Sequence, residues 1–190
     1  ADLSGHTLLS GASGMGKTTI CLSALSEALQ RNQPGIVLDD QTIMRAITLE
    51  EALDVELRRY SPSLEPHSGT RALELCSETQ PLVVVVEDIN RSENTERLLN
   101  KLVGWALQKI SGTQGTRWRL VCPVWPRFLT TIDKKDDVSK AGMVHVIGLY
   151  TEEEAREAVK RRCKLLALPM DDLAASAVAQ ALGNDPLLIG

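Results

Sequence analysis

Short apolar runs alternate with amphipathic stretches along the first part of the chain. The run His6–Ser10 stops at a glycine and predicts a strand, which the loop Gly11–Gly16 follows. From Lys17 onward, apolar residues recur at the spacing of a helix with one buried face, which ends at Pro34. Gly35–Leu38 is a second short apolar run. This part of the chain therefore predicts a strand, a helix and a strand.

The middle of the chain contains the strongest strand signal. Thr48 stands directly before a stretch with helical apolar spacing, and Glu51 lies three residues after Thr48. This capping-box pattern predicts a helix that runs to about Tyr60. A short helix is expected over Thr70–Glu78. The run Leu82–Val86 is continuously aliphatic, which is typical of a parallel strand buried on both faces.

The rest of the chain continues the alternation. It predicts a helix, two strands and two helices, in that order, at Asn94–Ile110, Arg119–Cys122, Met143–Leu149, Thr151–Leu168 and Met170–Leu182. Pro123 and Pro126 are expected to disrupt the end of the first of these strands. Strands that alternate with helices indicate an α/β fold, with a parallel sheet flanked by helices.

Composition agrees with a globular chain that has an aliphatic core. Of 190 residues, 43% are hydrophobic but only 3% aromatic, and the formal net charge is −4. A mildly acidic chain gives no direct signal for nucleic acid. The longest aliphatic run is far shorter than the ~18 residues of a membrane helix, and no signal peptide is visible. The four scattered cysteines indicate buried thiols, so a cytoplasmic location is expected.

The loop after the first strand matches the phosphate-binding pattern G-x-x-x-x-G-K-[ST]. Its glycines let backbone N–H groups turn toward phosphate oxygens, and the following helix adds its positive N-terminal end. Lys17 is expected at the β- and γ-phosphates and Thr18 at Mg²⁺. The expected nucleotide-binding residues are Gly11, Ala12, Ser13, Gly14, Met15, Gly16, Lys17, Thr18 and Thr19.

An acidic pair, Glu87-Asp88, follows the strongest strand. A carboxylate at this position suits Mg²⁺, and a second one can orient and deprotonate the attacking water. We therefore expect Lys17, Glu87 and Asp88 to be catalytic. Glu87 as the metal ligand with Asp88 as the base is the direct alignment, and the reverse assignment remains open.

The spacing of these motifs narrows the type of P-loop protein. About 70 residues separate the phosphate-binding loop from the acidic pair, and they contain one clear strand and several helical segments. This predicts the arrangement in which an extra catalytic strand lies between the two motif-bearing strands, rather than the arrangement of small-molecule kinases. No N-K-x-D guanine signature is present, which favours ATP over GTP.

Two further segments resemble the STAND class of signal-transduction NTPases, which includes the NB-ARC and NACHT modules. The segment Leu149–Ala155 resembles a strand that ends in L-[ST]-x-x-E-A, and Gly183–Pro186 resembles the G-x-P motif of the helical lid. The resemblance implies that Pro186 lies against the nucleotide base. Family members often carry a γ-phosphate-sensing arginine after the fourth core strand, and Arg127, displaced by two prolines, is the nearest candidate.

The resemblance implies an ATPase core over residues 1–150, and the start of a helical lid over 151–190. It implies slow, regulatory ATP hydrolysis with Mg²⁺, in which the nucleotide state controls homo-oligomerisation. The chain is then expected to be a fragment of a longer signalling or innate-immunity protein. Its trigger and effector domains stay unknown.

Three alternatives remain. An AAA+ type ATPase would carry a sensor arginine in a lid helix, with Arg156 or Arg161 as candidates. A nucleotide-binding scaffold would hydrolyse little and hold nucleotide as a structural element. A small-molecule kinase would transfer phosphate to a metabolite.

Overall fold

The structure is a computed structural model that describes residues 5–86, 89–108 and 116–189. The described residues form one parallel sheet in the order β2-β3-β4-β1-β5. Its strands are β1 Thr7–Ser10, β2 Gly35–Leu38, β3 Leu82–Val86, β4 Trp118–Val124 and β5 Val144–Val146. The predicted fold class is confirmed, because β4 separates the strand before the phosphate-binding loop from the strand before the acidic pair.

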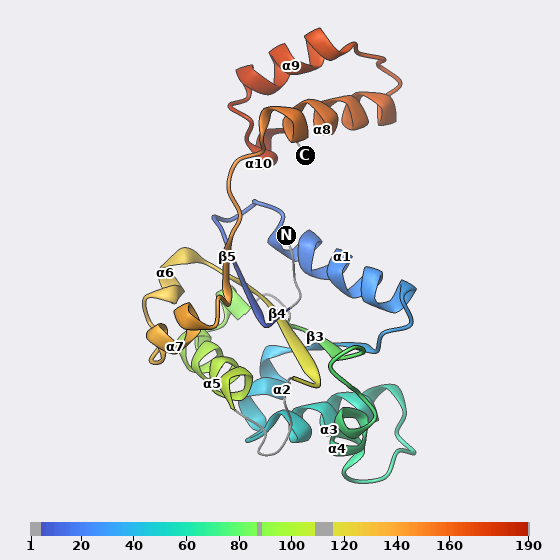
Figure 1. Ribbon diagram of the computed structural model, residues 1–190, viewed down its shortest axis with the longest axis vertical. Coiled ribbons are helices and arrows are strands. Elements are labelled where there is room, and N and C mark those ends of the chain that lie inside the picture. Colours follow the sequence, from blue (N-terminus) through green and yellow to red (C-terminus); the bar gives the residue numbers. More distant parts are fainter. Residues whose placement is uncertain (1–4, 87–88, 109–115, 190) are drawn as a thin grey trace. The chain divides into compact units, whose positions relative to one another are not determined.

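Helices connect the strands (Figure 1). Those that precede β4 are α1 Lys17–Gln30, α2 Asp40–Arg45, α3 Leu49–Tyr60, α4 Ser68–Glu74, the 3₁₀ turn η1 Ile89–Arg91 and α5 Thr95–Leu107. Those that follow it are α6 Pro126–Leu129, α7 Lys135–Lys140, α8 Glu152–Leu165, α9 Asp172–Ala181 and α10 Pro186–Ile189. Among the described residues, no helix combines the length and the apolar character needed to span a membrane.

Helices cover both faces of the sheet. Val84 and Val86 of β3 belong to a buried cluster with residues of α2, α3 and α5. Val83 and Val85 point to the opposite face because side chains alternate along a strand, and they are buried as well. Figure 1 shows α1 on that side of the strands, and it contacts β3. The continuous aliphatic run therefore forms a strand buried on both faces, as its sequence predicts.

The contacts divide the chain into two compact units. One contains β1 to its end at Ser10, together with residues 17–146. The other contains residues 11–16 together with residues 147–190. The sheet and helices α1 to α7 lie in the first unit, and helices α8, α9 and α10 lie in the second.

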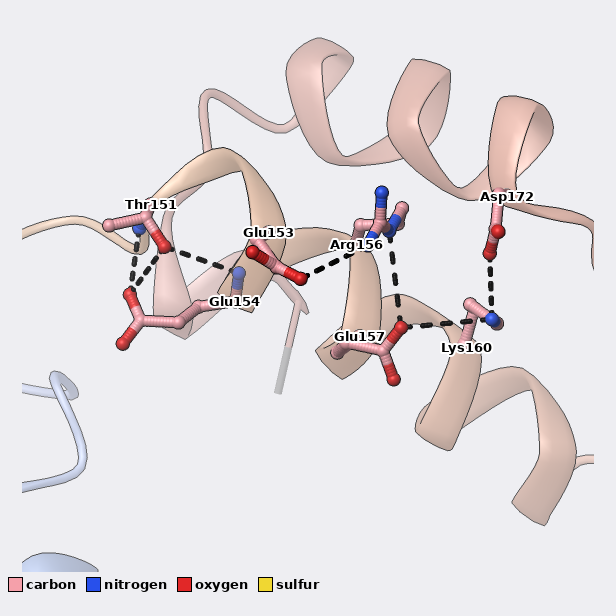
Figure 2. A network of polar contacts seen from close by, with 7 residues as sticks. All are labelled: Thr151, Glu153, Glu154, Arg156, Glu157, Lys160 and Asp172. Atoms are coloured by element: carbon pink, nitrogen blue, oxygen red, sulfur yellow. Dashed lines mark hydrogen bonds and ion pairs between the residues drawn. The ribbon is translucent and has the colours of Figure 1, made fainter.

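The second unit is organised around α8 and α9. Figure 2 shows the N-terminus of α8, where Thr151 and Glu154 form a reciprocal capping box. Farther along, the Nζ atom of Lys160 lies 2.7 Å from a carboxylate oxygen of Asp172 at the start of α9. Small residues, among them Ala155 and Ala175, let the two helices pack closely in a small core.

Several element boundaries differ from those that the sequence predicts. β4 continues through Pro123 to Val124, so the expectation that this proline disrupts the strand is wrong. On one side of this extension, the backbone remains in parallel register with β1. The side chain of Asn90 also donates a hydrogen bond to the carbonyl of Pro123. A side chain thus provides a partner for a backbone acceptor near the end of the strand.

Other differences concern short elements. The helix α2 was not predicted, and β5 is shorter than the run Met143–Leu149. Asp39 caps α2 by accepting a hydrogen bond from the Thr42 N–H at 2.6 Å. All four cysteines are free thiols, and three of them are buried, as expected.

Candidate nucleotide-binding site

The phosphate-binding loop joins the end of β1 to the start of α1. Gly14 and Gly16 have positive φ angles of 84° and 74°. Residues with a side chain rarely adopt this left-handed region, so both glycines are required by the path of the loop. The loop conformation therefore explains why glycines occupy these positions of the motif.

The start of α1 suits an anion. The first turn of this helix contains no acidic residue, so its positive end is not neutralised from within. Lys17 is the first residue of the helix and its side chain is largely buried, whereas Thr18 and Thr19 are exposed. A largely buried cation beside exposed hydroxyls is the arrangement that the motif requires.

The carboxyl ends of β1 and β4 meet at one edge of the sheet. Ser10, the last residue of β1, lies opposite Val124, the last residue of β4. β3 runs parallel to β4, so its carboxyl end at Val86 lies at the same edge. Glu87 and Asp88 lie outside the described residues, and their assigned roles stay predictions. In parallel α/β sheets, ligands bind outside this carboxyl edge.

A cavity of about 660 Å³ lies at this edge. Thr18 of α1 lines it, together with Val86 at the end of β3 and Pro123 near the end of β4. Its volume is in the range of about 300–1,000 Å³ that small-molecule sites occupy. Thr18, whose hydroxyl is proposed for Mg²⁺, therefore lines a space large enough for a ligand.

The far wall of this cavity contains a polar network that the sequence did not reveal. Arg59 of α3 bonds both Asp39, at the end of β2, and Glu56, whose carboxylate accepts at 3.0 Å. Glu56 also accepts from the hydroxyl of Thr42 at 3.3 Å and is buried. Buried charges require such partners. The only sequence signal was Asp39 three residues before Thr42, a spacing that marks a helix cap.

The network holds Asp39 in its ionised form. Burial alone would raise the pKa of Asp39, but hydrogen bonds from the Thr42 N–H and from Arg59 outweigh it and lower the pKa below its ordinary value. The same contact with Asp39 raises the pKa of Arg59. This wall of the cavity therefore carries fixed charges of both signs.

Arg127 lies on α6, directly after β4. Its guanidinium carbon lies 4.7 Å from the ring centroid of Trp125 and 4.6 Å from that of Phe128. These contacts hold an exposed arginine by cation–π attraction. Its predicted role as a γ-phosphate sensor remains a prediction.

The second unit contains the other predicted residues. Gly183 and Asn184 have positive φ angles of 64° and 54°, and Pro186 begins α10. The carbonyl of Asn184 accepts from the Tyr150 N–H at 2.9 Å, which joins the two segments named for the family resemblance.

The two lid arginines differ in their surroundings. Arg156 forms ion pairs with Glu153 at 3.4 Å and Glu157 at 3.9 Å, as Figure 2 shows. Arg161, the other candidate for a sensor arginine, is exposed. A sensor role for either arginine remains a prediction.

Solved structures of other proteins have a similar fold. A point mutant of RuvB from Thermotoga maritima matches with a TM-score of 0.52 and 21% identity, over 97% of this chain and 52% of that one. The Walker-type ATPase of Pyrococcus abyssi matches with a TM-score of 0.50 and 17% identity, over 97% and 60%. DnaA from Aquifex aeolicus, solved with AMPPCP bound, matches with a TM-score of 0.51 and 14% identity, over 98% and 53%.

These similarities define the class of fold. At such identities they establish the fold alone, and that fold is the one of P-loop ATPases. This chain spans between half and two thirds of the length of the proteins it matches. Neither a protein-family model nor a curated protein matches the sequence.

Proposed function

We propose that this chain is an ATP-binding, Mg²⁺-dependent ATPase module of the AAA+ type. One observation carries the proposal: the sequence Gly11–Thr18 joins β1 to α1 in a sheet where β4 separates β1 from the strand before the acidic pair. The similarity to the AAA+ proteins RuvB and DnaA supports this type over the STAND class. The separated strands also argue against a small-molecule kinase.

Each motif residue has a defined role in this proposal. The loop N–H groups and Lys17 bind the phosphates, and Lys17 offsets the charge that develops during transfer. Mg²⁺, when bound, would supply positive charge that offsets the charge of the phosphates. The hydroxyl of Thr18, an exposed residue that lines the cavity, would suit this cation, which prefers oxygen ligands. Glu87 or Asp88 supplies the carboxylate ligand, and the other one orients water for in-line attack.

The remaining predicted residues would complete the nucleotide site. Residues 151–190 are proposed to begin a helical lid, in which Pro186 contacts the base, and Arg127 is proposed to sense the γ-phosphate. Nucleotide-dependent homo-oligomerisation and a cytoplasmic location belong to the same proposal. The partners that trigger or read the nucleotide state remain unidentified.

A STAND-type signalling role is the second candidate, and one observation favours it. The hydrogen bond from Tyr150 to Asn184 joins the segment after β5 to the turn before Pro186, so both segments of the resemblance belong to one folded unit. ADP that is retained through purification, with negligible turnover in the full-length protein, would favour a nucleotide-binding scaffold over both of these candidates.

Steady-state ATP hydrolysis tests the proposed activity. We expect turnover that requires Mg²⁺ and falls by at least about 100-fold in Glu87→Gln and in Asp88→Asn. The metal ligand is identified as the residue whose loss raises the Mg²⁺ concentration needed for nucleotide binding. Turnover that both substitutions leave unchanged would exclude the acidic pair from catalysis.

A further inference from the structure

Asn90 connects two segments at the carboxyl edge of the sheet. It lies in η1, two residues after the acidic pair, and only 3% of it is exposed. Its side-chain Nδ2 donates to the carbonyl of Pro123 at 3.0 Å, and its Oδ1 accepts from the Trp125 N–H at 2.6 Å. One amide thus bonds the backbone on both sides of Val124.

The turn that carries Asn90 is itself fixed. The hydroxyl of Thr95, at the start of α5, donates to the carbonyls of Ile89 at 2.7 Å and Ser92 at 2.6 Å. Thr95 is buried, so water does not compete for these bonds. These contacts hold the backbone of η1 against the start of α5.

The segment that Asn90 holds leads directly to Arg127. The backbone N–H of Trp125 donates a hydrogen bond to the side chain of Asn90, and the Trp125 ring packs against the Arg127 guanidinium. Among the described residues, Arg127 forms no ion pair with a carboxylate. Its guanidinium packs against the rings of Trp125 and Phe128.

We propose that Asn90 is a positioning residue that holds the segment between β4 and Arg127, so that discrimination between ATP and ADP depends on it. The inference rests on the proposed ATPase function, in which Arg127 senses the γ-phosphate. The Asn90 amide bonds the backbone on both sides of Val124, so it fixes the short segment from which Arg127 extends.

Equilibrium binding of Mg²⁺-ADP and of Mg²⁺-AMPPNP, an ATP analogue that is not hydrolysed, tests the proposal. The measured quantity is the ratio of the two dissociation constants in wild type and in Asn90→Ala. We expect preference for the analogue to fall by about tenfold in Asn90→Ala, within the usual range for coupled sites. ADP affinity should change by less than about twofold, because the residues that bind the α- and β-phosphates are untouched.

The chain offers a matched control for this substitution. Asn100 of α5 makes the same pair of bonds, donating to the Thr131 carbonyl at 3.0 Å and accepting from the Asp133 N–H at 2.8 Å. Asn100→Ala should therefore lower stability in a similar way while leaving the ratio of affinities unchanged. A reduced ratio in both variants would show a general structural effect and overturn the proposal.

Arg127→Ala provides a second test that does not depend on folding of the Asn90 variant, since Arg127 is exposed. We expect Arg127→Ala to reduce the ratio, and the double variant to reduce it no further, because both residues act through one contact. An unchanged ratio in Arg127→Ala, or fully additive effects, would overturn the inference. Failure of the wild-type protein to bind either nucleotide would instead contradict the proposed function.

Discussion

Partly buried polar side chains in the first unit form hydrogen bonds with backbone groups that are distant in sequence. The Nζ atom of Lys101 on α5 donates to three carbonyls at the end of α2, those of Ile43, Met44 and Ala46, at 3.0, 3.0 and 2.8 Å. His6 at the start of β1 accepts from the Leu120 N–H at 3.1 Å. Such contacts form only when the chain folds, and the loss of each one can be tested by substituting a single residue.

The free energy of unfolding should depend on pH through the protonation of His6. Burial, assisted by the charge of Arg119, lowers the pKa of His6 from 6.5 to about 4. The unfolded chain therefore binds a proton between these values that the folded chain does not. The contribution of neutral His6 to the free energy of unfolding is complete above pH 6.5 and is lost as the pH falls toward 4.

Urea unfolding at pH 7 and pH 5 measures this effect. Between pH 7 and pH 5, the free energy of unfolding should fall by about 2 kcal/mol more in the wild-type protein than in His6→Leu. The difference between the proteins matters, because carboxylates contribute equally to both. Parallel stability curves for the two proteins would contradict the low pKa of His6.

Lys101 should stabilise the end of α2. Lys101→Met keeps the apolar stem but leaves three carbonyls without their charged donor, so the free energy of unfolding should fall by about 2–3 kcal/mol. Lys140→Met, at an exposed position of α7, is the control and should change it by less than about 0.5 kcal/mol. Equal effects of the two substitutions in denaturant unfolding would show that the Lys101 contacts are not formed.

At the scale of elements, α3 and α4 form a tight helical pair. Asp54 of α3 accepts from the backbone N–H groups of His67 and Gly69, at 3.0 and 2.6 Å, and so caps α4 from outside. A Cβ atom at Gly69 would lie 2.2 Å from the carbonyl oxygen of Glu50. The absence of a side chain at Gly69 is what allows the two helices to approach.

Two glycine-to-alanine substitutions should therefore have opposite effects. Gly69→Ala forces α4 away from α3 and should reduce the free energy of unfolding by about 2 kcal/mol or more. Gly104→Ala in α5 meets no atom within 4 Å and should increase it by roughly 0.5–1 kcal/mol, through the higher helix propensity of alanine. Thermal unfolding compares them directly, and stabilisation by both substitutions would contradict the packing of α4.

The sequence predicted the elements whose own residues carry a recognisable pattern, such as an aliphatic run or a capping residue. The strand Leu82–Val86 follows from its aliphatic run, and the starts of α3 and α8 follow from their capping residues. The helix α2 was missed because its six residues are too few for a periodic pattern, and one of its caps, Lys101, lies far along the chain. The extension of β4 was missed because the hydrogen bond from Asn90 to the Pro123 carbonyl is identified only by the fold.

At the scale of the whole molecule, the order of the strands is the main support for the proposed ATPase function. The motif spacing predicted an extra strand between those that carry the motifs, and β4 lies there. The sequence also predicted the phosphate-binding loop, through a pattern whose glycines adopt the required φ angles. It could not reveal the Asp39–Arg59–Glu56 wall of the cavity, because these residues come together only when α3 packs beside the end of β2.

Nucleotide should stabilise the protein as a whole. A ligand that binds only the folded state at 100 times its dissociation constant adds about 2.7 kcal/mol to the free energy of unfolding. We therefore expect Mg²⁺-ATP to raise the unfolding midpoint in denaturant, and to raise that of Lys17→Ala by about half as much or less, since binding weakened tenfold adds only about 1.4 kcal/mol. A shift of equal size in both proteins would show that nucleotide acts away from the loop.

Equilibrium binding of Mg²⁺-ATP to the wild-type chain and to Lys17→Ala, measured by calorimetry, tests the central claim most directly. The lysine makes charge-assisted hydrogen bonds to phosphate in the proposed site, so its loss should weaken binding by at least about tenfold. Lys140→Ala serves as the control for loss of one positive charge and should bind as the wild type does. Equal affinity of wild type and Lys17→Ala, or no binding to the wild-type chain, would contradict the account.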